Sequence, residues 1–426
     1  MQPLSVGVDF GTSNTVIAVA GQGQAAVLSV AGRTGIATAL PSILCFRPDE
    51  RNARDRPVSS AGADAIADYI GRTGPARLVQ SMKSFLGSRS FVETRIFSHM
   101  YTLDALIGTL LNHLYDSTSA RDSLAQAPLV AGRPIRFAGN SPDDALAQSR
   151  LIAAFTSAGK APSRMGLEPE AAAYAFARRV TGRHLVLVAD LGGGTSDFSI
   201  VEVDSNEHGS KITPLAQTGI GIAGDRFDYG IVYNAVCPAL GMGSEFQPEA
   251  KRLPIPLWIY SNFSSWHQLS MMNNRETLRR IIDVLRTAVD REAFEGLVHV
   301  IRNEEGFSLF QAVSRVKQTL TSETSARLRF KAGPVEVDRT VTRAEFEHWI
   351  AEDLSSVGAT MDQALSIAGV SRSQITRVFM TGGSALVPAV RELFARKFGS
   401  EKLVGGDEFS SVAQGLALMG VGGGNA

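Results

Sequence analysis

The feature that most constrains this chain is a strand–turn–strand pattern that occurs twice, far apart in the sequence. In the first copy, an apolar run ends in Asp9 and Phe10, and a turn of Gly, Thr, Ser and Asn leads into a second apolar run. The second copy ends in Asp190 and Leu191, 181 residues further along, and its turn consists of Gly and Thr. Solenoid repeats are much shorter, about 20–50 residues, so this spacing indicates two duplicated lobes.

Helical and strand-like stretches alternate along the rest of the chain, which predicts a mixed α/β fold. The predicted helices cover residues 145–158, 170–180, 276–297, 309–321, 343–368 and 387–398. Residues 241–275 contain three prolines and two of the three tryptophans, and we interpret them as an irregular insertion.

The composition is that of a globular protein, with 44% hydrophobic and 20% charged residues. Lys plus Arg and Asp plus Glu both total 42, so the chain lacks the basic excess expected of a nucleic-acid-binding protein. No secretory signal or membrane-spanning stretch is apparent, so we expect a cytoplasmic protein with no membrane partner. Cys45 and Cys237 are interpreted as two reduced thiols, with one buried disulfide as the alternative.

The two turns have the composition of a phosphate-binding cradle. Glycine has no Cβ to block close approach, so successive backbone N–H groups can converge on phosphate oxygens. One such turn is equally typical of a plain hairpin, whereas two copies with matched aspartates favour phosphate binding. Asp9 and Asp190 would then orient a hydrated Mg²⁺ between the lobes. The predicted phosphate-binding residues are Gly11, Thr12, Ser13, Asn14, Gly192, Gly193, Gly194 and Thr195.

Five stretches resemble, in order, motifs of the seventy-kilodalton heat-shock (DnaK-type) chaperone family. They are the two Asp-Gly turns and the runs Leu167–Tyr174, Gly224–Asp228 and Phe379–Pro388. The resemblance extends from Val6 to about Leu418. It implies a two-lobed, actin-like ATPase fold, in which duplicated mixed-sheet, ribonuclease H-like subdomains are accompanied by two peripheral subdomains.

The resemblance also implies catalytic roles for four residues. Lys83 would contact the γ-phosphate and the attacking water, although a lysine by itself is typical of a solvated surface. Glu168 would lie near that water, although it also suits the positive end of a helix that starts at Pro169. Thr195 and Asp197 match positions that contact the γ-phosphate and activate water, although such residues also cap turns.

Further contacts to the nucleotide are implied by the same resemblance. The residues concerned are Gly224, Asp225, Lys317, Thr321, Gly382, Gly383 and Ser384. Ser314 stands where the family has Glu, a departure expected to weaken or alter contacts to the ribose or base. The run Gly219–Gly224 fits the dinucleotide pattern G-x-G-x-x-G, but no convincing ribose-binding acid follows about 20 residues later. We interpret this run as the turn before a helix of the second lobe.

The predicted boundaries place lobe I at residues 1–182 and lobe II at residues 183–384, with an insertion at 241–310. A C-terminal segment at 385–426 would return a helix to lobe I. Because the chain ends soon after that helix, we expect no peptide-binding domain. In this respect the chain resembles the short YegD-like branch of the family.

These features predict slow, Mg²⁺-dependent hydrolysis of ATP to ADP and phosphate, coupled to opening and closing of the lobes. The lobe movement would regulate a partner protein of unknown identity. The alternatives are a small-molecule kinase of the same superfamily, an actin-like filament protein and a nucleotide sensor that does not hydrolyse. Residues 241–275 are the candidate partner contact through Trp258, Trp266 and His267, although buried tryptophans would equally serve the core.

Overall fold

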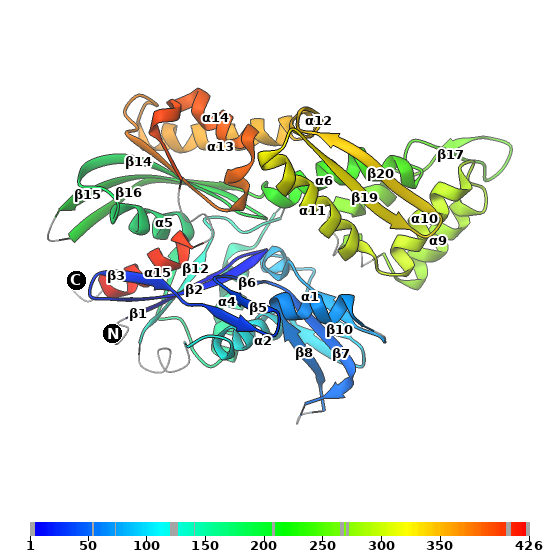
Figure 1. Ribbon diagram of the computed structural model, residues 1–426, viewed down its shortest axis with the longest axis horizontal. Coiled ribbons are helices and arrows are strands. Elements are labelled where there is room, and N and C mark those ends of the chain that lie inside the picture. Colours follow the sequence, from blue (N-terminus) through cyan, green and yellow to red (C-terminus); the bar gives the residue numbers. More distant parts are fainter. Residues whose placement is uncertain are drawn as a thin grey trace. The chain divides into compact units, whose positions relative to one another are not determined.

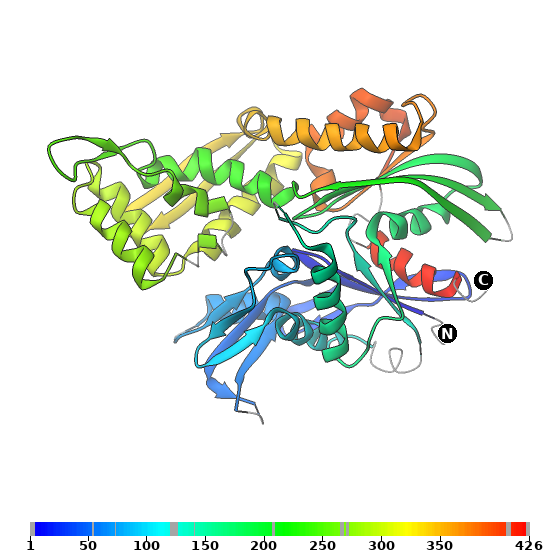
Figure 2. The same cartoon turned by 180° about the vertical axis from the view of Figure 1, so that it is seen from behind.

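The chain divides into two compact units in the computed structural model (Figures 1 and 2). Unit 1 comprises Met1–Ala223, Val357–Ala385 and Val390–Ala426, and unit 2 comprises Gly224–Ser356 and Leu386–Ala389. The predicted lobe boundaries after residues 182 and 384 stay a prediction. The structure describes residues 5–52, 55–72, 74–119, 127–139, 141–206, 209–264, 268–269, 272–405 and 410–422.

Unit 1 contains two mixed sheets with the same sequence of strand directions. In spatial order, the first consists of β13 (Arg164–Leu167), β12 (Leu129–Arg133), β1 (Ser5–Phe10), β2 (Asn14–Gly21) and β3 (Gln24–Val27). The second consists of β22 (Leu403–Gly405), β21 (Arg377–Thr381), β14 (Gly182–Leu191), β15 (Ser196–Asn206) and β16 (Gly209–Ile220). In each sheet the first three strands are parallel and the last three are antiparallel. The sequence repeat is therefore a repeat of a whole sheet, and the predicted mixed α/β class is confirmed.

Two helices, α5 (Glu168–Ala177) and α15 (Ser411–Gly422), lie in the layer between these sheets (Figure 1). Helix α15 packs against β1, β2 and α5, and α5 packs against β14 and β15. Both helices bury apolar side chains in one core together with strands of both sheets. Small residues permit this close packing, because a Cβ added at Gly415 would collide with the Ala171 carbonyl oxygen. Helix α5 begins at Glu168, so the packing of α15 fixes the position of a predicted site residue.

The outer part of unit 1 is built on smaller sheets and helices. Its strands are β4 (Val30–Gly32), β5 (Gly35–Ala37), β6 (Leu40–Pro41), β7 (Leu44–Arg51), β8 (Pro57–Ala61), β9 (Arg77–Val79), β10 (Glu93–Ile96) and β11 (His99–Thr102). Its helices are α1 (Gly62–Ile70), the 3₁₀ helix η1 (Met82–Phe85), α2 (Leu103–Asp116) and α4 (Asp144–Ser157). Strand β6 pairs with β2 and thereby joins this region to the first main sheet.

Among the described residues, four further helices belong to unit 1, except for residues 351–356 and 386–389, which belong to unit 2. They are α13 (Ala351–Ala368), η5 (Gly383–Leu386), α14 (Pro388–Phe398) and η6 (Ser400–Lys402). Within unit 1, the Thr218 hydroxyl of β16 donates a 2.9 Å hydrogen bond to the Thr360 carbonyl of α13. Helix α13 is thereby tied to the strand that ends next to the second Asp-Gly turn.

Unit 2 centres on a hairpin of β19 (Ser325–Ala332) and β20 (Val335–Thr342) that is packed by helices (Figure 2). Strand β19 alternates strictly between exposed and buried residues, the pattern of a strand with one face on a core. The helices are α6 (Gly224–Ile231), η2 (Val232–Val236), η3 (Cys237–Leu240), α7 (Trp258–Ser261), η4 (Asn262–Ser264), α9 (Arg275–Leu285), α10 (Arg291–Arg302), α11 (Gly306–Ser322) and α12 (Arg343–Trp349). A short hairpin of β17 (Glu245–Phe246) and β18 (Leu253–Pro254) completes the unit.

Two predicted helices are each broken in the structure. The helix predicted at 276–297 stops at Leu285, because the Thr287 carbonyl and the Val289 N–H hydrogen-bond to the backbone of Gln247 and Glu245 instead. The Asp290 side chain then caps α10 by accepting from the Ala293 N–H. The helix predicted at 343–368 is interrupted at Ile350, whose side chain is fully buried. In both cases tertiary contacts override a continuous helical pattern.

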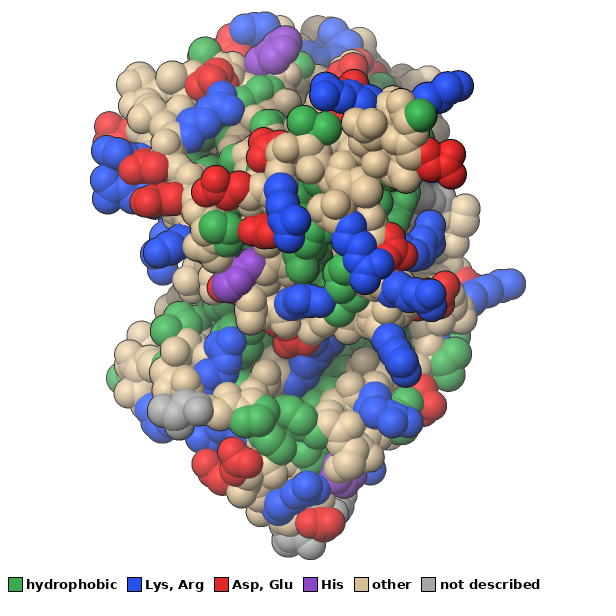
Figure 3. All heavy atoms as spheres, turned by 90° about the vertical axis from the view of Figure 1, so that its right-hand side faces the viewer, with side chains coloured by type: hydrophobic (Ala, Val, Ile, Leu, Met, Phe, Trp, Pro, Cys, Tyr) green, Lys and Arg blue, Asp and Glu red, His purple; other side chains and the backbone are tan. Residues whose placement is uncertain are grey.

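Both cysteines are buried and free, which confirms the prediction of reduced thiols. Within the part of the chain that the structure describes, no helix is both long and apolar enough to cross a bilayer. On the face drawn in Figure 3, basic and acidic side chains are interspersed.

The close packing of α5 and α15 generates the first prediction. In an open helix, Gly415→Ala would stabilise the chain by about 1 kcal/mol through helix propensity. Here the added methyl group meets the Ala171 backbone, so we expect a net loss of about 1–3 kcal/mol in the free energy of unfolding. Thermal or denaturant unfolding measures the loss, with Gln414→Ala as the control in the same helix. A variant as stable as wild type would show that the two helices are not in this contact.

Candidate active site

The two Asp-Gly turns of unit 1 have the same backbone hydrogen bond. The Gly11 N–H donates to the Asn14 carbonyl at 3.0 Å, and the Gly192 N–H donates to the Thr195 carbonyl at 3.0 Å. Each turn comprises four residues between strands paired in the same register, so that Asp9 and Asp190 occupy equivalent positions. The duplicated cradle predicted from the sequence is therefore present as a duplicated backbone geometry.

The structure brings the two turns and the predicted adenosine turn together. A Cβ built at Gly194 would lie 3.0 Å from the Thr12 hydroxyl, which places the second turn beside the first. Gly382 has φ 84° and abuts the Leu191 backbone, a position that only glycine suits. The Ser384 hydroxyl then donates a 2.7 Å hydrogen bond to the Gly192 carbonyl. Gly193 and Gly383 lie half-buried in the same two turns.

Lys83 and Glu168 form a buried ion pair beside the turns. The Lys83 Nζ lies 2.7 Å from the Glu168 Oε1, and the two side chains are 9% and 5% exposed. Glu168 is the first residue of α5, so the helix predicted at 170–180 begins two residues earlier and ends at Ala177, and Lys83 lies in η1 after Ser81, which has the left-handed φ of 54°. Lys83 is therefore a buried residue and not a solvated surface lysine. Removing either partner of such a pair would leave an uncompensated buried charge.

Three aspartates crowd around this pair. Burial and the neighbouring charge of Glu168 raise the pKa of Asp9 to about 7, and the same two causes raise the pKa of Asp190 well above its ordinary value. Burial opposes the charge of Lys83, but the negative charges of Glu168, Asp9 and Asp190 raise the pKa of its ammonium group. With Asp197, the cluster therefore contains four carboxyl groups and one cationic side chain, that of Lys83.

Asp197 is the third aspartate and lies opposite Asp190 across the β14–β15 pair. Its Oδ1 accepts a 3.1 Å hydrogen bond from the Ile135 N–H, whereas its buried Oδ2 has no hydrogen-bond partner among the described residues. Burial and the Glu168 charge raise its pKa to about 7. A Cβ at Gly219 on the next strand would come within 2.5 Å of the Asp197 Oδ1, so glycine makes room for this carboxyl group.

A hydrated divalent cation fits this cluster. Of the described residues, no three His, Cys, Asp or Glu side chains are arranged to hold a metal ion directly. Neither Asp9 nor Asp190 accepts a hydrogen bond from another described residue, so both carboxylates are free to accept from metal-bound water. Mg²⁺ characteristically keeps several waters and uses one or two carboxylates. An excess of buried carboxyl groups is also what a cation would neutralise.

Two supporting residues were not found from the sequence. The Ser42 hydroxyl donates a 2.8 Å hydrogen bond to the Gly11 carbonyl, and its N–H donates to the Ser13 carbonyl at 2.8 Å. Arg150 of α4 donates to the carbonyls of Leu86, Ser88 and Phe91 at 3.0, 2.9 and 2.6 Å, and to the Phe85 carbonyl at 3.4 Å. It thereby clamps the loop that follows Lys83. Both sets of hydrogen bonds join residues that are far apart in the chain, so no local sequence pattern predicts them.

The other predicted contacts lie in unit 2. Lys317 of α11 donates a 2.9 Å hydrogen bond to the Asp228 Oδ2 and a 3.0 Å hydrogen bond to the Gly224 carbonyl. These bonds tie α11 to the start of α6, where burial raises the pKa of Asp225 to about 6. Thr321 and Ser314 are half-buried on α11. Lys317, Gly224 and Asp225 thus form one group, and its role stays a prediction.

The predicted partner contact lies partly outside the described residues. Trp266 and His267 belong to that undescribed part. Trp258 is half-buried, and the Arg280 guanidinium lies 4.8 Å from the centre of its ring. This cation–π contact ties α7 to α9 within unit 2.

The Arg150 clamp predicts local mobility in a variant. Arg150→Met would remove the hydrogen bonds to four carbonyls, so amide hydrogen exchange in residues 84–92 should accelerate roughly tenfold or more, the effect of about 1.4 kcal/mol of lost local stability. Exchange in α2 should stay unchanged. Arg89→Met, which removes an 83% exposed arginine from the same loop, is the matched control. Equal exchange in Arg150→Met and wild type would show that the loop is held in another way.

The raised aspartate pKa values predict how stability depends on pH in metal-free protein. Asp9 binds its proton more tightly when folded, with a pKa of about 7 against the ordinary 3.8, so the free energy of unfolding falls as pH rises through this window. Asp9→Asn removes this dependence and should be more stable than wild type at pH 8 by about 1 kcal/mol or more, with a smaller gain at pH 5. Denaturant unfolding in buffer with a chelator measures the gain at both pH values, and Asp204→Asn, at an exposed position, is the control. A gain equal at both pH values would contradict the crowded-carboxylate account.

Comparison with known proteins points to one family. Residues 298–423 match the family model described as Hsp70 protein. The chain is 27% identical over 433 residues to the chaperone protein DnaK of Thermus thermophilus, and 26% identical to the DnaK proteins of Deinococcus proteolyticus and Deinococcus radiodurans. Each alignment covers 97% of this chain but only 60%, 58% and 59% of the respective relative. Over nearly its whole length, the chain is therefore similar to Hsp70-family proteins of the DnaK type.

Proposed function

We propose that this protein hydrolyses ATP to ADP and phosphate at the cluster in unit 1, with Mg²⁺ as the cofactor. The observation that carries the proposal is the buried Lys83–Glu168 ion pair, surrounded by three aspartates beside two glycine cradles. Phosphoryl transfer to water requires positioning and charge stabilisation more than covalent chemistry. A fixed cation, phosphate-binding N–H groups and a water-orienting carboxylate meet these requirements.

In this proposal each residue has a distinct task. The N–H groups of the turns at residues 11–14 and 192–195 bind the phosphates. Lys83 contacts the γ-phosphate, and Glu168 holds the ammonium group in place through the 2.7 Å ion pair. Asp197 has a free buried Oδ2 and a pKa of about 7, which suits a group that orients the attacking water and accepts its proton near neutral pH. Thr195 contacts the γ-phosphate from the same turn.

Asp9 and Asp190 would hold the metal ion through water. When bound, Mg²⁺ supplies positive charge to the phosphates and to the crowded carboxylates. Gly382, Gly383 and Ser384 would bind the adenosine, since Gly382 and Ser384 contact the backbone of the second turn. The contacts to the nucleotide implied for Gly224, Asp225, Lys317 and Thr321, and their alteration by Ser314, stay predictions from the resemblance.

The wider role rests on the similarity to Hsp70-type proteins. We infer a two-lobed, actin-like ATPase whose opening and closing regulates a partner protein, and an assignment to the YegD-like branch. The chain spans about 60% of the length of its DnaK relatives, so their chaperone activity is a proposal here. The kinase, filament and sensor alternatives have weaker support, because the Lys83, Glu168 and Asp197 cluster provides for water as the acceptor.

Phosphate release from ATP tests the proposal. Purified protein with Mg²⁺ should release phosphate slowly, and Lys83→Met should lower the rate by about 100-fold or more, since it removes the fixed cation. Lys160→Met, a lysine outside the cluster, is the matched control and should release phosphate at the wild-type rate. ADP binding by Lys83→Met, measured by calorimetry, checks that the site is intact. Wild-type protein that binds ATP but releases no phosphate would favour the sensor or the kinase.

A further inference from the structure

A cavity lies in the outer part of unit 1. It has a volume of about 510 Å³ and is bounded by the β4–β5 hairpin, β8, α1 and the end of α2. None of the proposed catalytic, phosphate-binding or metal-binding residues lines it. Its volume lies within the range of about 300–1,000 Å³ that is typical of small-molecule sites.

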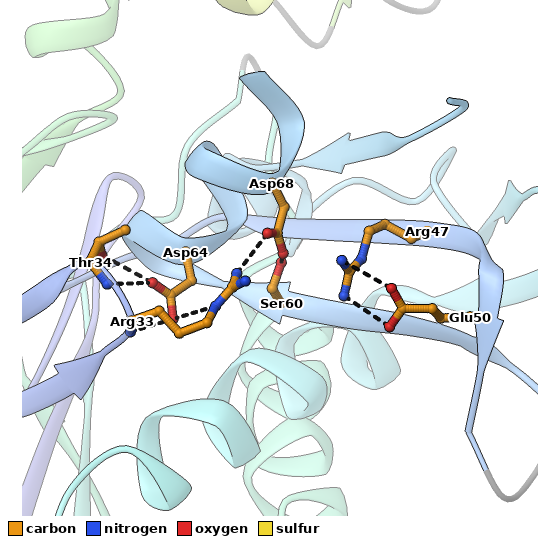
Figure 4. A network of polar contacts seen from close by, with 7 residues as sticks. All are labelled: Arg33, Thr34, Arg47, Glu50, Ser60, Asp64 and Asp68. Carbon is orange, nitrogen blue, oxygen red and sulfur yellow. Dashed lines mark hydrogen bonds and ion pairs between the residues drawn. The ribbon is translucent and has the colours of Figure 1, made fainter. Parts of the chain in front are cut away.

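The polar end of this cavity is a pair of carboxylates joined by one arginine (Figure 4). The Arg33 Nη2 lies 2.6 Å from the Asp68 Oδ1, and its Nε lies 3.5 Å from the Asp64 Oδ2. The Ser60 hydroxyl donates to the Asp68 Oδ2 at 2.7 Å, and the Thr34 N–H donates to the Asp64 Oδ1 at 3.0 Å. The guanidinium of Arg33 therefore occupies the position between two anchored carboxylates.

The exposure of these groups is unequal. The Asp64 and Asp68 side chains on α1 are 19% and 9% exposed, whereas the Arg33 side chain is 62% exposed on the β4–β5 hairpin. Burial alone would raise the pKa of Asp68, but hydrogen bonds from Ser60 and Arg33 keep it below its ordinary value, so the group is ionised at neutral pH. The carboxylates are thus fixed parts of the cavity, while the arginine reaches in from a solvated hairpin.

The other arginine of the lining, Arg47, has its own partner. Its Nη1 and Nη2 lie 3.1 and 3.2 Å from the two carboxylate oxygens of Glu50, which is outside the lining (Figure 4). Without Arg33, the polar end would therefore hold two carboxylates, and the nearby charge of Arg47, which also acts on Asp68, would be shared with Glu50. That charge arrangement favours a cationic ligand over an anionic one.

The rest of the lining is largely apolar. Val30 and Leu40 are buried in its walls, and Ile36 on the hairpin is 78% exposed at its rim. An aliphatic or aromatic body of a few carbons would bury apolar surface against these residues. A ligand that suits the whole cavity therefore combines a cationic head with an apolar body.

We propose that this cavity binds a small organic cation, a guanidine, amidine or amine on an apolar body, and that Arg33 occupies the cation position until the ligand displaces it. The Arg33 side chain is 62% exposed, so water can replace the carboxylates around its guanidinium when a ligand displaces it. The Arg33 guanidinium itself demonstrates that a planar cation fits between Asp64 and Asp68.

Calorimetry with benzamidine, in the absence of nucleotide, tests this proposal independently of ATP hydrolysis. Arg33→Ala should bind benzamidine with roughly millimolar affinity, which is reasonable for a fragment of this size. Wild-type protein should bind at least tenfold more weakly, because its own arginine competes. Arg33→Ala/Asp68→Asn and Arg33→Ala/Asp64→Asn should each lose the binding, and their melting temperatures verify that they fold.

Benzoate and benzyl alcohol, which match benzamidine in size, are the chemical controls and should not bind. Binding of benzoate in preference to benzamidine would overturn the proposal and assign the cavity to anions through Arg47. Benzamidine binding that is equal in wild type, Arg33→Ala and the aspartate variants would also overturn it, because the cation would then not lie between the carboxylates.

Discussion

The rest of the site depends on the ion pair between Lys83 and Glu168. In the described part of unit 1, the Lys83 ammonium group is the one positive charge that lies among the four carboxyl groups of the cluster. Burial and mutual repulsion disfavour the ionised aspartates, so the metal-free cluster is electrostatically strained. A bound divalent cation would relieve that strain. In the proposed function, the same charges that disfavour the ionised aspartates would favour a metal–phosphate ligand.

The position of this ion pair is set by packing far from the charges. Glu168 starts α5, and α5 is held by α15 through a contact that requires glycine at position 415. Lys83 is held by the loop that Arg150 clamps from α4. The two partners therefore arrive from separate parts of unit 1, and each is fixed by backbone contacts. These contacts explain how two charged side chains that are almost fully buried are held 2.7 Å apart.

Much of unit 1 could be predicted from the sequence because its signals are local and occur twice. The Asp-Gly turns and their flanking strands follow from residue order alone, and the structure confirms them, whereas the helix predicted at 170–180 lies at Glu168–Ala177. The breaks after Leu285 and at Ile350 were missed, since they arise from contacts with β17 and from a buried side chain. Ser42 and Arg150 were missed for the same reason: their partners are distant in sequence. The roles of the site residues stay proposals.

The most direct test of the central claim is the effect of Mg²⁺ on the affinity for ADP, measured by calorimetry with and without a chelator. If the crowded carboxylates bind a metal ion together with the phosphates, Mg²⁺ should tighten ADP binding by at least about tenfold, or 1.4 kcal/mol. Asp190→Asn should remove most of that gain while it leaves weak metal-free binding in place. Equal affinity with and without Mg²⁺ would contradict the account, because the carboxylates would then serve no cation.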